Sequence, residues 1–167
     1  IFSAGINQSL FSYMTKFRDF YRDAKGEIKT HTAPSGVRGL DFAPKGYRVA
    51  LSHYNGVSLW FPNTAAEPEG LAWRGSHLDV VVSPDGKFVV TAMQENALHG
   101  WRLADGQHMR MSGYPAKTEA LSFTRRGKWL ASSGADATST TGTVSDMLIA
   151  ICVIDVDIWS DCNYIYS

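Results

Sequence analysis

The stretch VVVSPDGKFVV, Val80 to Val90, places four turn-forming residues between two apolar runs. The runs are rich in β-branched and aromatic side chains, which is typical of short strands. Between them, Pro84 fixes the φ angle of a tight turn, Asp85 can hydrogen-bond back to the backbone, and Gly86 accepts a positive φ. The stretch predicts two strands joined by a turn, although Ser83 and Asp85 could also belong to a reactive loop.

The same pattern occurs three times at a nearly constant spacing. LDFAPKGYRVALSHYNGVSLW starts at Leu40, VVVSPDGKFVVTAMQENALHGW at Val80, and LSFTRRGKWLASSGAD at Leu121. The anchors that recur every 40 or 41 residues are the turn glycines Gly46, Gly86 and Gly127, the later turn residues Asn55, Asn96 and Asp136, and the tryptophans Trp60 and Trp101. Because several independent anchors share one period, the chain is built from a repeat.

The repeat decides how Ser83 and Asp85 are interpreted. At the equivalent positions, one unit has Ala43 and Lys45, and another has Thr124 and Arg126. A turn can recur without keeping the same side chains. A reactive pair, in contrast, gives no reason for a turn to recur at the same position of every unit. Both residues are therefore predicted to be turn residues.

Each unit holds the signals of four short antiparallel strands in about 40 residues, which is the arithmetic of a β-propeller blade. The predicted fold is all-β, with about three four-stranded units that form an incomplete ring. Residues 1–36 would supply trailing strands of a preceding blade, 37–76 and 77–117 two blades, and 118–167 a partial or irregular blade with an insertion. Because stacked repeats bury their core against neighbours, either other blades of a longer chain or a second chain that closes the ring is expected.

From Tyr21 to Asp136 the sequence resembles the WD-repeat β-propellers, and its weak signature is similar to divergent bacterial members. VVVSPDGKFVV is similar to the family's first hairpin, KWLASSGAD to its second strand, and GVSLW and LHGW to its third strand. The resemblance implies a rigid binding scaffold and a structural hydrogen-bond set that includes Trp60, Trp101 and Asp136, with Asn55 and Asn96 replacing the aspartate. The family's Gly-His pair is missing, neither tryptophan is followed by Asp, and only Ser132 matches its serine.

The pattern breaks after Asp136. Gly142 stands where a third tryptophan is expected, and residues 137–167 contain no Lys, Arg or His. ATSTTGTVSD is predicted to be a loop, and the strand-like run Met147 to Trp159 follows late. Three interpretations remain: an insertion before the third strand, a differently used strand, or a tail that is not the natural continuation.

Charge and composition argue against several classes of partner. The 16 Lys and Arg balance 16 Asp and Glu, so neither nucleic acid nor a membrane surface is expected as a partner. The longest apolar run, Met147 to Ile154, is too short to span a membrane. Cys152 and Cys162 are too few for a disulfide framework. A cytoplasmic protein is expected.

No catalytic or metal site converges in the sequence. The five histidines, His31, His53, His77, His99 and His108, occupy different blade positions, so no ring of ligands is predicted, although a two-histidine site between adjacent blades stays open. His77, Asp79 and Ser83 supply the residue types of a hydrolase triad without the glycine pattern of a nucleophile elbow. No cofactor is expected.

The predicted function is a non-catalytic scaffold that binds a protein or peptide. Trp73 and Tyr114 occupy one equivalent position and are either packing residues or exposed anchors for a partner. The alternative is a propeller enzyme or metal-binding protein whose site is completed by blades missing from this chain.

Overall fold

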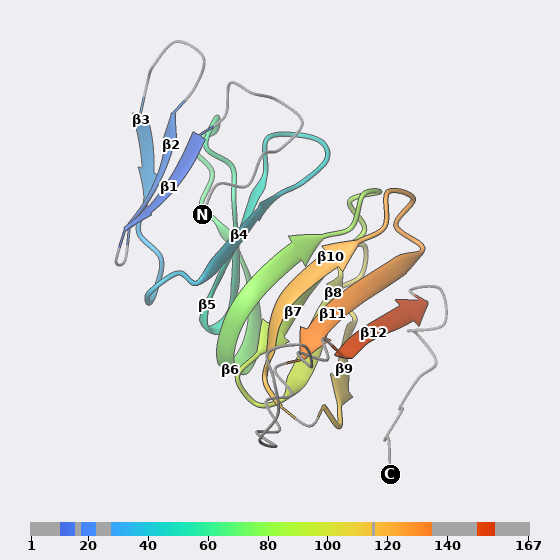
Figure 1. Ribbon diagram of the computed structural model, residues 1–167. Coiled ribbons are helices and arrows are strands. Elements are labelled where there is room, and N and C mark those ends of the chain that lie inside the picture. Colours follow the sequence, from blue (N-terminus) through green and yellow to red (C-terminus); the bar gives the residue numbers. More distant parts are fainter. Residues whose placement is uncertain (1–10, 16–17, 23–27, 115, 135–149, 156–167) are drawn as a thin grey trace, which may run out of the picture.

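The computed structural model of the protein describes residues 11–15, 18–22, 28–114, 116–134 and 150–155 (Figure 1). These residues form strands and connecting turns, with no helix among them. The strands are β1 Phe11–Thr15, β2 Arg18–Arg22, β3 Ile28–His31, β4 Gly39–Phe42, β5 Val49–Trp60, β6 Glu69–Val82, β7 Phe88–Met93, β8 Ala97–Arg102, β9 His108–Ser112, β10 Thr118–Phe123, β11 Trp129–Gly134 and β12 Ala150–Asp155.

The strands pair in chain order in three antiparallel sheets. One sheet has the order β1-β2-β3, a second β4-β5-β6-β7-β8-β9, and a third β10-β11-β12. Figure 1 shows the six-stranded sheet curling as it passes from β4 to β9, with β10 lying beside β6. The all-β, antiparallel architecture expected from the sequence is confirmed.

The long strand β5 reverses direction near its middle. The ring Nε2 of His53 lies 2.9 Å from Oγ of Ser58, whereas five residues of extended chain would cover roughly 16 Å. The reversal falls at Asn55 and Gly56, which have φ values of 67° and 145°. Strand β5 therefore consists of two antiparallel segments, joined at the Asn-Gly pair that favours a hairpin.

The long strand β6 bends in a similar way at Gly75, whose φ is 126°. Nε2 of His77 lies 3.0 Å from the carbonyl oxygen of Trp73, four residues earlier, which extended backbone would not allow. Residues Glu69 to Ala72 pair with β5, and residues His77 to Val82 pair with β7, while Ser76 at the bend still pairs with Tyr54 of β5. The bend thus passes the strand from one partner to the other.

The turn between β6 and β7 uses the side chains that the opening stretch singled out. Oγ of Ser83 accepts hydrogen bonds from the backbone N–H groups of Lys87, at 3.1 Å, and Phe88, at 2.9 Å. It also donates to the Asp85 carboxylate at 2.6 Å. The following Gly86 has a φ of 76°. Both polar side chains are committed to the turn.

Segments one repeat apart lie side by side. Oδ2 of Asp41, on β4, accepts a hydrogen bond of 2.8 Å from the backbone N–H of Val82. Oδ2 of Asp79, on β6, accepts one of 3.1 Å from the N–H of Leu121. These carboxylates connect neighbouring first strands, which share no hydrogen-bonded ladder, so each unit is tied to the next.

The turns of successive units also stack. A Cβ placed on Gly86 would lie 3.5 Å from Cγ of Pro44, and a Cβ on Gly127 would lie 3.2 Å from Cδ of Pro84. In both cases the turn glycine of one unit rests on the turn proline of the unit before it. The same glycine–proline contact thus occurs between two successive pairs of units.

The buried core is divided among the units. One cluster joins Ala50, Val57, Leu59, Leu71, Val80, Val82, Val89 and Trp101. A second holds Val90, Ala92, Leu98 and Leu130, and a third holds Val49, Leu51 and Trp60. Since the first two clusters take side chains from successive units, burial as well as hydrogen bonding joins the repeats.

Part of the sequence analysis falls outside the described residues. Asp136 and the Ser/Thr-rich stretch after it lie there, as do most of residues 1–27 and 156–167. Within the run expected to be a late strand, β12 pairs with β11 in antiparallel register. The boundaries of the predicted units stay predictions. Among the described residues there is no helix of the length and apolarity needed to cross a membrane.

Candidate protein-interaction site

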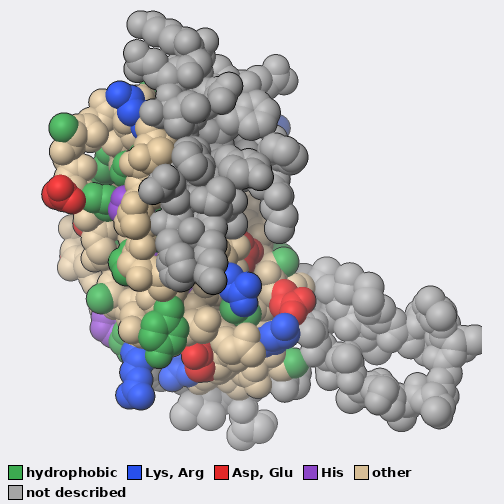
Figure 2. Space-filling model, turned by 90° about the vertical axis from the view of Figure 1, so that its left-hand side faces the viewer, with side chains coloured by type: hydrophobic (Ala, Val, Ile, Leu, Met, Phe, Trp, Pro, Cys, Tyr) green, Lys and Arg blue, Asp and Glu red, His purple; other side chains and the backbone are tan. Residues whose placement is uncertain are grey.

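A shallow hollow opens where the β5 reversal meets the first half of β6. Its lining residues are Tyr54, Asn55, Ala72, Trp73 and Arg74. On the face drawn in Figure 2, the visible hydrophobic side chains lie in separate spots between polar and charged ones. The coloured part of this face therefore shows no broad apolar patch.

Hydrogen bonds hold the two sides of the hollow in place. Oδ1 of Asn55 accepts a bond of 3.2 Å from the backbone N–H of Gly75, across to β6. The backbone N–H of Tyr54 donates to Oγ of Ser35 at 2.9 Å. At Gly56, a Cβ would overlap the carbonyl oxygen of Leu71, so only glycine permits this close approach of the two strands.

Trp73, proposed from the sequence as a partner contact, lies half-buried at the hollow. Its ring stacks on His99 with centroids 4.0 Å apart, and it lies at 4.8 Å from the ring of His108. One part of the indole therefore packs against the next unit, while another part lines the hollow. Packing and exposure, weighed against each other in the sequence, occur together at this residue.

Tyr114, the equivalent of Trp73, contacts residues of its own unit and of the next one. Its hydroxyl lies 3.1 Å from Oγ of Ser132 and 3.5 Å from Sδ of Met111. The half-buried ring packs against the cluster that contains Leu98 and Leu130. Both equivalent residues therefore pack against the following unit, but of the two only Trp73 lines the hollow.

His77 is a buried structural residue that orients the backbone of Trp73. Its Nε2 must donate to the carbonyl oxygen of Trp73, at 3.0 Å, because that oxygen can only accept. Burial lowers the pKa of His77, so the ring is neutral and Nδ1 accepts from Oγ1 of Thr91 at 2.8 Å. Oγ1 of Thr91 also lies 3.2 Å from the His99 carbonyl oxygen. Because a hydroxyl has a single proton to donate, we assign it to the shorter contact, with Nδ1 of His77.

His99 is fully buried and its two ring nitrogens have no hydrogen-bond partner. The ring lies between the indoles of Trp73 and Trp101, at centroid distances of 4.0 and 4.5 Å. Burial, together with the charges of His108, His77 and Arg110, lowers the pKa of His99 to about 3. At neutral pH it therefore acts as an uncharged aromatic spacer.

The repeat anchors occupy structural positions. Trp60 and Trp101 are 6% and 3% exposed, and Trp60 stacks on His31 at a centroid distance of 5.6 Å. Asn55 and Asn96 both adopt a positive φ, of 67° and 51°. The glycines Gly46, Gly86 and Gly127 share φ values of 82°, 76° and 74°.

Sequence reasoning missed Thr91 and Asp41. Thr91 lies 41 residues before Ser132, so the repeat itself placed a hydroxyl there, although only the serine was matched. Asp41 carries no such sequence signal because its equivalent one unit later is Val81. Its role depends on the approach of a neighbouring strand, which no local pattern shows.

The residue types of a hydrolase triad do not form one. His77 is committed to Thr91, Asp79 to the backbone of Leu121, and Ser83 to Asp85. No group of three or more His, Cys, Asp or Glu residues able to hold a metal ion occurs among the described residues. The rings of His99 and His108, both in the unit 77–117, have centroids 5.3 Å apart.

No protein-family model matches the chain. Among curated proteins, a probable glutathione S-transferase DHAR2, chloroplastic, from Oryza sativa subsp. japonica is 29% identical over 100 residues, which cover 59% of this chain and 33% of that protein. WD repeat-containing protein slp1 from Schizosaccharomyces pombe is 28% identical over 120 residues, which cover 68% of this chain and 25% of that protein. The chain thus spans a third or less of either relative, and the two similarities point to different classes of protein. The curled antiparallel sheet is compatible with similarity to a WD-repeat protein.

Proposed function

We propose that the chain is part of a WD-repeat-like β-propeller that acts as a non-catalytic scaffold for a protein or peptide partner. The observation that carries the proposal is the course of the backbone through one period. Strand β4, the two segments of β5 and the first segment of β6 make four antiparallel segments. The second segment of β6 with β7, β8 and β9 makes four more.

These eight segments are interpreted as two blades. Strands β10 to β12 would then be three strands of a further blade, and β1 to β3 the trailing strands of a preceding one. The carboxylates of Asp41 and Asp79 join the first strands of successive units, which are the strands nearest the axis of a propeller. A closed ring would take further blades from a longer chain.

Binding, rather than chemistry, is proposed because the polar residues of the described part serve structure. Ser83, His77 and Asp79 each have a structural partner, while the hollow beside Trp73 remains open. The name of the similar fission-yeast protein specifies WD repeats, a class whose members mostly act as rigid scaffolds. A cytoplasmic location stays a prediction from composition.

The test is affinity capture with the full-length protein from its own organism, followed by reconstitution of each captured complex from purified components. A stoichiometric complex with a defined dissociation constant is expected. A substrate turned over by the purified protein, at a rate abolished by one point mutation, would contradict the proposal.

The alternative, an enzyme or metal-binding propeller completed by further blades, is tested by metal analysis of the same full-length preparation. Stoichiometric zinc, calcium or iron that survives dialysis would favour this alternative over the scaffold.

A further inference from the structure

We propose that the hollow lined by Tyr54, Asn55, Ala72, Trp73 and Arg74 docks a short acidic peptide segment that also carries an aromatic or large aliphatic residue. The inference rests on the proposed scaffold function and specifies the chemistry of its partner. In this arrangement a peptide carboxylate pairs with Arg74, and the adjacent apolar side chain packs against Tyr54 and Trp73.

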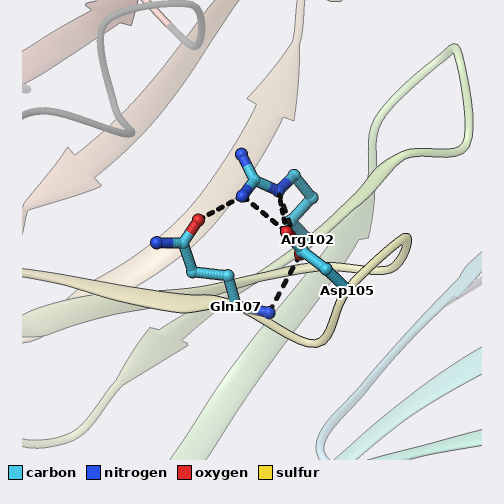
Figure 3. Close-up of polar contacts among 3 residues, drawn as sticks. All are labelled: Arg102, Asp105 and Gln107. Carbon is cyan, nitrogen blue, oxygen red and sulfur yellow. Dashed lines mark hydrogen bonds and ion pairs between the residues drawn. The ribbon is translucent and has the colours of Figure 1, made fainter.

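The charge argument begins with Arg74. It is the charged residue of the lining, its side chain is exposed, and no carboxylate of the described chain forms an ion pair with it. Two other arginines of the described residues, by contrast, pair with carboxylates of the chain itself. Arg102 donates to the Asp105 carboxylate and to Oε1 of Gln107 (Figure 3), and Arg48 pairs with Glu69.

Glu95, an acidic residue beside Gly75, is bound to the backbone of the chain itself. Its Oε1 accepts a hydrogen bond of 3.1 Å from the N–H of Ser76, and Glu95 does not line the hollow. The guanidinium of Arg74 therefore offers its planar donors to an external carboxylate, the group that this geometry recognises best.

The apolar argument rests on the two aromatic residues. Tyr54 is 56% exposed, which makes it the most exposed of the large hydrophobic side chains in the described chain. Trp73 cannot swing away, because its ring is packed on His99 and its carbonyl oxygen is held by His77. Aromatic residues and arginine are the side chains that contribute most to binding energy at protein interfaces.

The hollow is also preformed. The Asn55–Gly75 hydrogen bond joins its two sides, and Ser35 fixes the backbone of Tyr54. A site whose backbone is already fixed loses little conformational entropy when a ligand binds. A segment of a few residues is thus sufficient for measurable affinity.

The experiment uses a randomised hexapeptide library displayed on phage, selected against the full-length protein. Enriched sequences are synthesised and titrated calorimetrically against wild type, Arg74→Glu and Tyr54→Ala. Arg102→Glu is the matched control, since it makes the same change in net charge on an arginine outside the hollow. Circular dichroism and melting temperature verify that each variant is folded.

The expected result is enrichment of Asp or Glu next to Trp, Phe, Tyr or Leu. Arg74→Glu should raise the dissociation constant of these peptides about tenfold or more, and selection against that variant should enrich Lys or Arg instead. Tyr54→Ala should raise this dissociation constant several-fold, and Arg102→Glu should leave it unchanged.

Acidic peptides that bind wild type and both hollow variants equally would overturn the inference and leave the scaffold function intact, because binding would then lie elsewhere. A library without enriched acidic sequences would likewise overturn it, while the capture experiment on full-length protein judges the scaffold function separately.

Discussion

The carboxylate of Asp41 accepts a hydrogen bond from the backbone N–H of Val82, 41 residues further along the chain. A second oxygen of the same carboxylate accepts from the N–H of Phe42. Desolvation raises the pKa of Asp41, and the nearby Asp79 adds to this effect. The Asp41 side chain thus accepts a hydrogen bond from a backbone N–H of the next unit, and it also places a poorly hydrated charge between the two units.

Replacing Asp41 separates these two contributions. Asp41→Ala leaves the Val82 N–H without its acceptor and should lower the free energy of unfolding by about 1–3 kcal/mol. Asp41→Asn removes the charge and keeps one of the two acceptor oxygens, but its amide NH2 then faces the other backbone N–H, so its stability at pH 7 should lie between those of Asp41→Ala and wild type. Urea denaturation of both variants measures the difference, and an Asn variant as unstable as the Ala variant would contradict this account.

The same pair predicts a pH dependence. Because the pKa of Asp41 is raised in the folded state, folding favours the protonated form and wild type should gain stability relative to Asp41→Asn as the pH falls through that pKa. The stability of wild type relative to Asp41→Asn should therefore rise as the solution is acidified from pH 7. A relative stability of wild type that falls on acidification would exclude desolvation as the dominant cause.

The hydrogen bond between Thr91 and His77 is tested by an isosteric change. Thr91→Val removes the donor to Nδ1 of the buried His77, and the unpaired nitrogen should cost about 1–3 kcal/mol of unfolding free energy. Thr124→Val, at an exposed turn, is the matched control, and it should cost less. In a double-mutant cycle with His77→Phe, the two losses should be less than additive. Full additivity would mean that the two side chains do not interact.

His99 should make the protein sensitive to acid. Its pKa is lowered to about 3 in the folded state, whereas an unfolded histidine has a pKa of about 6.5. The stability that this group contributes is fully present above pH 6.5 and is lost as the pH falls toward 3, by up to about 1.4 kcal/mol per pH unit. His99→Phe should reduce this slope between pH 7 and 5, as measured by urea denaturation at each pH. Equal slopes for wild type and His99→Phe would contradict the prediction.

Gly56 and Gly46 form a matched pair for the β5 reversal. At Gly46, with a φ of 82°, a Cβ would meet nothing within 4 Å, so Gly46→Ala carries only the strain of a positive φ, about 1 kcal/mol. Gly56→Ala adds an overlap with the Leu71 carbonyl oxygen, and its melting temperature should fall much further. Similar melting temperatures for the two variants would place the reversal elsewhere.

The strands beside the recurring turns could be predicted from the sequence because the turn-forming residues repeat. Ser83 to Gly86 defines a turn by its own residue types, and the period then locates the equivalent turns even where Lys45 or Arg126 replaces the aspartate. The period did not distinguish Trp73 from Tyr114, which occupy one equivalent position. Trp73 lines the hollow, whereas the hydroxyl of Tyr114 lies beside that of Ser132. Their difference arises from His99 and Ser132 on other strands.

The contacts between units were not predictable for a related reason. Asp41 and Asp79 make the same type of bond from positions that are two residues apart in the repeat, and Gly39 takes the position equivalent to Asp79. A Cβ at Gly39 would lie 2.9 Å from the Asp79 carboxylate, so the two positions are coupled through space. Such coupling leaves no trace in spacing or hydropathy.

The stacking of Gly86 on Pro44 and of Gly127 on Pro84 has a consequence for how the repeats are oriented. Each of these two contacts joins a unit to its predecessor, through a rigid ring and a residue without a side chain. A substitution at one such glycine would change the tilt at one joint and leave the next joint intact. In the proposed propeller, where the first and last blades must meet, small errors of this kind would add up around the circle.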